Sequence, residues 1–221
     1  MPTPRRGLTI AAASGVAFGI VLAVRTIIIP SPPPLSEGEE ALAAYFADNR
    51  TLVLAAGYLT GFIVAFGTWF AAGLRRRLRS GGDGLAGDVA FGSWVVIAAI
   101  ALVRFAFGST VAFIPEYDLG VLAFAGTANA IMLSFLWFAY ALLVFATAYA
   151  AWHSKVFPLW HTLASSLVVI FYLVAASGVM VRTGSLAPNG SVATAGIWVT
   201  AAWTGITGLL LLTRPRIDLD E

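Results

Sequence analysis

The sequence predicts an all-α membrane protein, a bundle of six transmembrane helices with one short helix at the outer surface. Of the 221 residues, 59% are hydrophobic and only 11% are charged, with a mean hydropathy of +0.88. Six apolar runs are each long enough to cross a hydrocarbon core, which takes about 20 helical residues. No segment has the alternating pattern of a strand, and the loops are too short for a soluble domain. We therefore expect one transmembrane domain over residues 1–221.

The first span is predicted at residues 8–29, between a basic start and a proline-rich segment. Its apolar run is longer than the roughly 7–15 residues of a signal-peptide core, so we expect it to be retained. After the prolines, Ser36-Glu37-Gly38-Glu39 matches a capping box, and Leu42, Tyr45 and Phe46 follow at helical spacing. This pattern predicts a short amphipathic helix over about 36–50 that continues into the second span.

Polar and glycine-rich linkers separate the remaining apolar runs. Asp88 stands where it could cap the third span, and Pro158 stands where it could begin the fifth. These spans are predicted at residues 51–74, 89–114, 119–151, 159–181 and 193–213.

Basic residues in the loops predict the orientation, because Lys and Arg close to a span remain cytoplasmic. One side carries only Arg50 and Arg182, whereas nine basic residues share the side of the termini: Arg5, Arg6, Arg75, Arg76, Arg77, Arg79, Lys155, Arg214 and Arg216. We expect both termini in the cytoplasm. Twelve of the 13 basic residues are arginine, and alanine and glycine abound, which is typical of bacteria with GC-rich genomes. We therefore expect the inner membrane of a bacterium.

Arg25 and Arg104 are the candidate site residues, because ionisable side chains inside a span are costly. Counting about 1.5 Å per residue places both near the outer leaflet. One interpretation is structural: each arginine reaches the headgroups, or pairs with Glu116, Asp118 or a residue of the outer helix. The other is functional: with Arg182 they line an outward-facing pocket for an anionic group such as a lipid headgroup. Both interpretations are open from the sequence.

We expect no metal and no cofactor. The chain has no cysteine, and His153 and His161 flank a proline with no carboxylate nearby in the sequence, which argues against a metal or haem pair. The single lysine, Lys155, is in a predicted loop, so no span offers an amine for retinal. Hydrolase, metalloprotease and nucleotide-binding motifs are missing, so we assign no catalytic residue.

Membrane lipids are the expected partners. Arg75, Arg76, Arg77 and Arg79 directly follow the second span, where a basic cluster fixes topology and attracts anionic lipids. Small residues four apart occur at Gly15 and Gly19 and in two other spans, and they predict close helix packing within one chain or with a second subunit. The net charge of +2 is too balanced to indicate a nucleic-acid partner.

Three short segments carry a family resemblance: Tyr45-Phe46-Ala47-Asp48-Asn49-Arg50, Leu74-Arg75-Arg76-Arg77-Leu78-Arg79, and Phe157-Pro158-Leu159-Trp160. With them the whole chain resembles a family of bacterial six-helix membrane proteins, common in actinobacteria, that is classed as a domain of unknown function. In that family a histidine is expected where this chain has Asn49. The resemblance implies the architecture and transfers no catalytic residue.

Three functions follow from these observations. The favoured hypothesis is a non-catalytic membrane component, either an accessory subunit or a bundle that binds a lipid or small molecule. The first alternative is a small transporter or permease, although no internal repeat is visible. The second is a lipid-modifying enzyme of the outer face, in which Glu116, Asp118, Arg104 and Arg25 would act.

Overall fold

The computed structural model describes residues 4–113 and 119–213 of the chain. Within them, helices account for all regular structure: α1 (Pro4–Ile28), α2 (Gly38–Asp48), α3 (Arg50–Ser80), α4 (Gly84–Phe113), α5 (Leu119–Ser154), α6 (Leu159–Ala176) and α7 (Ser191–Thr213), with short 3-10 turns at Leu35–Glu37 and Ser177–Met180. Six of these helices are long and apolar enough to cross a membrane. The predicted all-α, six-span fold is confirmed.

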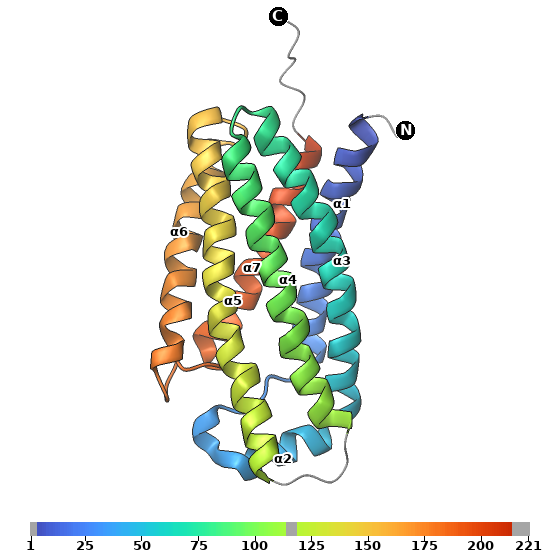
Figure 1. Cartoon of the computed structure of the whole chain (residues 1–221), viewed down its shortest axis with the longest axis vertical. Coiled ribbons are helices and arrows are strands. Elements are labelled where there is room, and N and C mark those ends of the chain that lie inside the picture. Colours follow the sequence, from blue (N-terminus) through green and yellow to red (C-terminus); the bar gives the residue numbers. More distant parts are fainter. Residues whose placement is uncertain (1–3, 114–118, 214–221) are drawn as a thin grey trace, which may run out of the picture.

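The six long helices stand side by side, and α2 lies across one end of them (Figure 1). Around the bundle, α7 packs on α1, α1 on α3, α3 on α4, α4 on α5 and α5 on α6. The start of α1 and the end of α7 lie at the end opposite α2 (Figure 1). We call these the terminal end and the α2 end of the bundle.

Small residues bring α1 and α7 into backbone contact. A Cβ added to Gly19 would meet the carbonyl oxygen of Ala201 at 2.7 Å, and one added to Gly208 would meet that of Ala12 at 2.9 Å. A Cβ on Gly15 would meet the Phe70 ring of α3 at 2.5 Å. The small-residue pair of the first span therefore packs inside this chain.

Two helix starts differ from the predictions. Glu37, the N-cap of α2, makes no side-chain cap hydrogen bond, so the predicted capping box is not formed. At α4 the expected cap, Asp88, lies inside the helix, and the Oδ1 of Asp83 instead accepts the Ala86 N–H at 2.9 Å. Asp88 is engaged elsewhere, because it accepts hydrogen bonds from two arginines of α3.

The outer helix is separate from the second span. Asn49 interrupts the chain with φ −112° and ψ 18°, which is not a helical conformation, and its side-chain amide donates to the Tyr45 carbonyl at 2.9 Å. Helix α3 then starts at Arg50. The prediction that the outer helix runs continuously into the span was wrong, because the asparagine amide terminates α2 at this point.

Helix α5 has 36 residues, so it is about 54 Å long and exceeds a hydrocarbon core of about 30 Å. Its first turns extend to the α2 end, where α2 packs against them. A second, smaller apolar core forms there, separate from the main core of the bundle: Leu42, Phe46, Val53, Val111, Ala112, Leu122 and Ala125. This core fixes α2 over the end of the bundle.

Candidate functional site

A cavity of about 70 Å³ lies beneath α2, between α1, α3, α4, α5 and α7. A single water needs roughly 10–15 Å³ by this kind of measure, so the cavity accommodates a group of several heavy atoms. Most of its lining is apolar and includes Ile29, Phe46, Val53 and Ile197. The lining also includes polar side chains, among them Thr26, Ser31 and Asn189, and two arginines carry its charge.

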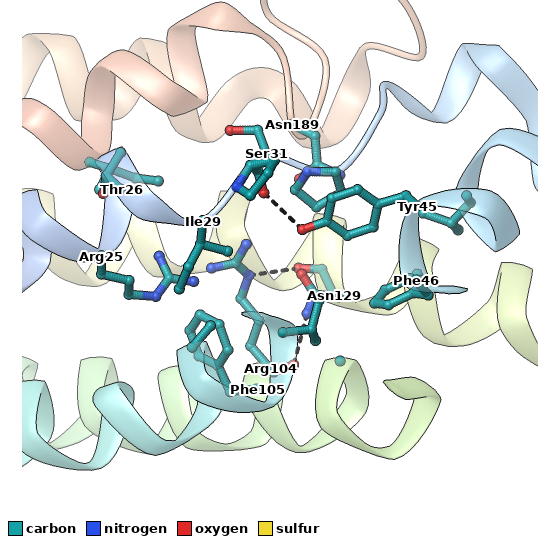
Figure 2. Close-up of a pocket in the computed structure, with 18 residues that line it drawn as sticks. Arg25, Thr26, Ile29, Ser31, Tyr45, Phe46, Arg104, Phe105, Asn129 and Asn189 are labelled. Carbon is teal, nitrogen blue, oxygen red and sulfur yellow. Dashed lines mark hydrogen bonds between the residues drawn. The ribbon is translucent and has the colours of Figure 1, made fainter. Parts of the chain in front are cut away.

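Arg25 of α1 and Arg104 of α4 both extend into this cavity. Arg25 belongs to the last turn of α1, and Arg104 lies about 13 Å before the end of α4. Figure 2 shows the two guanidinium groups pointing toward one another. The ring of Phe105 serves both, since its centroid lies 4.5 Å from the Cζ of Arg25 and 5.2 Å from the Cζ of Arg104. Both are cation–π contacts.

Asn129 of α5 fixes the position of Arg104, which is only 8% exposed. The Arg104 Nε donates to the Asn129 carbonyl at 3.0 Å, and the Asn129 side-chain amide donates to the Arg104 carbonyl at 2.9 Å. Each side chain thus bonds the backbone of the other residue, as the dashed lines in Figure 2 show. We call this pair of bonds the Arg104–Asn129 clasp. Among the described residues, no hydrogen bond engages the two terminal nitrogens of Arg104, so they are left for the cavity.

Arg25 has no such arrangement. Its Nε is buried and has no hydrogen-bond partner. Among the described residues, ion pairs are formed by Arg75 and Arg79, and no carboxylate lies within ion-pairing distance of Arg25 or Arg104. At an effective dielectric constant of about 20, two like charges several ångströms apart repel by roughly 2–4 kcal/mol. An anion between the two guanidinium groups would replace this repulsion with attraction.

The segment 29–34, which we call the strap, covers the cavity together with α2. Pro30, Ser31 and Pro32 of the strap line the cavity, and the Tyr45 hydroxyl of α2 donates to the Pro30 carbonyl at 2.8 Å (Figure 2). Burial raises the pKa of the Tyr45 phenol, so it remains protonated and keeps donating this bond at neutral pH. One hydrogen bond therefore joins the two parts of the cover.

The other predicted site residues are placed differently. Arg182 is exposed in the loop before α7 and does not line the cavity. Glu116 and Asp118 lie outside the described residues. Asn189 of the same loop does line the cavity, with a φ of 67°, a left-handed conformation that asparagine tolerates. Asn189 is not among the residues that the sequence indicates as a site, and the Asn-Gly pair there indicates only a turn.

The basic cluster at the terminal end makes a second set of contacts. Arg75 donates to Asp88 at 2.6 Å and Arg79 at 2.7 Å, so both α3 arginines bind one carboxylate of α4. Arg76 is exposed. The predicted anionic-lipid contact of this cluster stays a prediction, and its shown role is to join α3 to α4.

The two histidines do not form a site together. His153 is exposed and its Nδ1 contacts the Tyr149 carbonyl at 2.9 Å, whereas His161 is buried with its Nε2 2.9 Å from the Thr207 hydroxyl. In the described part of the chain, no group of three or more His, Asp or Glu side chains could hold a metal ion. Trp152 and Trp160 are 60% and 55% exposed at this end, as expected of residues at a membrane boundary.

A row of polar side chains joins α6 to α7. His161, Ser165 and Tyr172 of α6 bond Thr207, Trp203 and Thr200 of α7 at 2.8–2.9 Å, in antiparallel order along the two helices. Such interhelical bonds hold helices together where lipid offers no hydrophobic driving force. We infer that these three hydrogen-bonded pairs have a structural role, which is to hold α6 against α7.

Comparison of the chain with family models, with curated proteins and with solved structures gives no match.

Proposed function

We propose that this chain is a non-catalytic membrane protein that binds the anionic headgroup of a lipid in the cavity beneath α2. The observation that carries the proposal is the arginine pair. Two guanidinium groups face one cavity over the same phenylalanine ring, and no described carboxylate pairs with either of them. Buried charges in proteins are paired, so this arrangement supports a bound anion as the missing partner.

The position of the cavity favours a lipid headgroup. With the termini in the cytoplasm of a bacterium, as the loop charges predict, the α2 end faces outward. Arg25 is in the last turn of its span, which is the depth at which lipid phosphates lie. Arginine binds phosphate through two parallel hydrogen bonds, which adds geometric specificity to charge.

The proposal can be tested by the lipids that copurify with the protein. We would purify the wild type, Arg25→Gln, Arg104→Gln and Arg182→Gln in mild detergent and quantify lipid per chain by mass spectrometry. Arg182→Gln is the matched control, because it removes an exposed arginine that does not line the cavity. We expect about one anionic lipid per chain in the wild type and the control, and loss of about 90% of it in either cavity variant, since 1.4 kcal/mol changes an affinity tenfold.

Folding of the variants is checked by gel filtration and helical circular dichroism. If a glutamine variant does not fold, Arg104→Lys keeps the positive charge and removes only the paired hydrogen bonds. Equal lipid content in all folded variants would contradict the proposal. Lipid retention that is lost equally in Arg182→Gln would also contradict it, because the binding would then be general surface attraction.

A further inference from the structure

We infer that the cavity selects a doubly charged terminal phosphate, a phosphomonoester, over the singly charged phosphodiester of common membrane lipids. This inference rests on the proposed function, because it names the chemistry of the group held by the same two arginines. Three properties of the cavity lead to it: charge, hydrogen-bond donors and shape.

The charge balance favours a dianion. The described residues that line the cavity include two permanent cations, Arg25 and Arg104, and no carboxylate. A phosphodiester or carboxylate carries one negative charge and would leave one of these cations without a counter-charge. A phosphomonoester carries nearly two negative charges at neutral pH, because its second pKa is about 6. It neutralises both arginines.

The hydrogen-bond donors favour a group with several free oxygens. The Arg104–Asn129 clasp uses the Nε of Arg104, and no described residue bonds its terminal nitrogens. The Nε of Arg25 is buried without a partner. The Tyr45 hydroxyl already donates to the strap. Donors therefore come from two different helices, α1 and α4. A phosphomonoester presents three terminal oxygens to them, one more than a phosphodiester or a carboxylate.

The shape favours a terminal group. A cavity of about 70 Å³ accepts a phosphate that continues through a single ester oxygen. A phosphodiester needs room for two substituents, and in common anionic lipids the second is polar. Beyond the arginines the lining combines apolar side chains, such as Ile29 and Ile197, with polar ones, such as Ser31 and Asn189, so the small volume of the cavity is what limits a second substituent.

The titratable and charged groups that face the cavity are few. Helix α1 contributes Arg25, α4 contributes Arg104 and α2 contributes Tyr45, whereas the described lining residues of α3, α5, α7 and the strap have no titratable side chain. Arginine does not titrate, and Tyr45 stays protonated. Because no described group that faces the cavity titrates between pH 5 and 7.5, a change of phosphatidate affinity that phosphatidylglycerol does not share reports the second ionisation of the ligand.

The test is calorimetric titration of the delipidated full chain in a nonionic detergent. The probes are dioctanoyl phosphatidate, a phosphomonoester lipid; dioctanoyl phosphatidylglycerol, a phosphodiester lipid; and inorganic phosphate. We expect phosphatidate to bind at least about tenfold more tightly than phosphatidylglycerol at pH 7.5. Its affinity should rise about tenfold from pH 5 to 7.5, following the fraction of dianion, while that of phosphatidylglycerol stays constant.

The Arg25→Gln variant sharpens the test, because it leaves one guanidinium. We expect it to bind both lipids with about equal affinity, whereas Arg25→Lys keeps the preference and serves if the glutamine variant does not fold. Equal affinity of the wild type for both lipids, constant with pH and dependent on the arginines, would overturn the inference and leave the proposed function intact.

Two further outcomes separate the sources of the phosphate. If inorganic phosphate binds as tightly as phosphatidate, the selection of a phosphate dianion stands, and the lipid named in the proposed function is wrong. If none of the three probes binds, both the inference and the proposed function are overturned.

Discussion

The side chains of Arg104 and Asn129 each donate a hydrogen bond to the backbone carbonyl of the other residue. The arginine Nε donates to the Asn129 carbonyl at 3.0 Å, and the asparagine amide donates to the Arg104 carbonyl at 2.9 Å. This clasp joins α4 to α5 at the α2 end and orients a buried guanidinium toward the cavity. The clasp therefore has two roles: it stabilises the α4–α5 contact, and it orients Arg104 for the proposed ligand. Substitutions can test the two roles separately.

Asn129→Leu removes the side-chain half of the clasp. We expect the free energy of unfolding to fall by about 1–2 kcal/mol, the usual contribution of an interhelical hydrogen bond in a membrane protein or slightly more. Phosphatidate affinity should fall about three- to tenfold, because Arg104 loses its fixed orientation. Unfolding titration and calorimetry measure the two effects. Ser134→Ala, a buried polar change on the same helix, should lower stability without changing affinity. An Asn129→Leu protein with wild-type affinity would show that the clasp does not position Arg104.

Tyr45→Phe removes the hydrogen bond between α2 and the strap. The expected loss of stability is about 0.5–1.5 kcal/mol. The main effect should be local: amide hydrogen exchange should accelerate in residues 38–48 and at Ser31, and not in the middle of α3 or α4. Hydrogen-exchange mass spectrometry gives this comparison directly. Uniformly unchanged exchange would mean that the apolar core at the α2 end holds the cover without this bond.

Gly19→Ala tests the close approach of α1 and α7. The added Cβ would lie 2.7 Å from the Ala201 carbonyl oxygen, so the helices must separate, which costs about 1–3 kcal/mol. Gly61→Ala is the matched control, because nothing lies within 4 Å of its added Cβ. It should be neutral or stabilising by up to about 1 kcal/mol through helix propensity. Thermal unfolding in the same detergent distinguishes them, and equal melting temperatures would contradict the described α1–α7 contact.

The contact between His161 and Thr207 predicts which ring nitrogen of His161 carries the hydrogen. The Thr207 hydroxyl donates its only hydrogen to the Trp203 carbonyl at 2.7 Å, so its oxygen must accept from the Nε2 of His161. Nitrogen NMR of labelled histidine should therefore find the hydrogen on Nε2. Thr207→Val should cost about 1–3 kcal/mol, because it leaves that N–H buried without a partner. Thr147→Val, whose hydroxyl donates to the Leu143 carbonyl of its own helix, should cost less.

Glu116 and Asp118 allow a test of the competing structural interpretation from the sequence, in which these carboxylates pair with the arginines. The double variant Glu116→Gln, Asp118→Asn should bind phosphatidate within about twofold of the wild type if a ligand is the partner of the arginines. If the carboxylates are the partners, removing them frees two guanidinium groups. Phosphatidate affinity would then rise about tenfold or more, against our proposal.

The six long helices could be predicted because the cost of unpaired backbone groups in lipid makes long apolar runs helical. Their ends were harder to predict. Asp88 follows a glycine linker and has the composition of a cap, but two arginines one helix away compete for its carboxylate, and Asp83 takes the capping position. A local sequence pattern does not show that residues of another helix compete for the same carboxylate.

The site could be predicted in part. Counting residues along each span places Arg25 and Arg104 at a similar depth. Counting does not tell which way each helix is rotated about its axis. Only the structure therefore shows that the two arginines share a cavity and that both contact the ring of Phe105. The charge and the predicted side of Arg182 place it with them, but in the structure Asn189 of the same loop lines the cavity and Arg182 does not.

The most direct measurement of the central claim is native mass spectrometry of the wild type and the Arg25→Gln, Arg104→Gln double variant, purified gently from the host membranes. We predict one added mass per wild-type chain that releases a phosphate-containing lipid on activation, and a bare chain for the folded double variant. A wild-type chain without any added mass, or an added mass that persists in the double variant, would contradict the account.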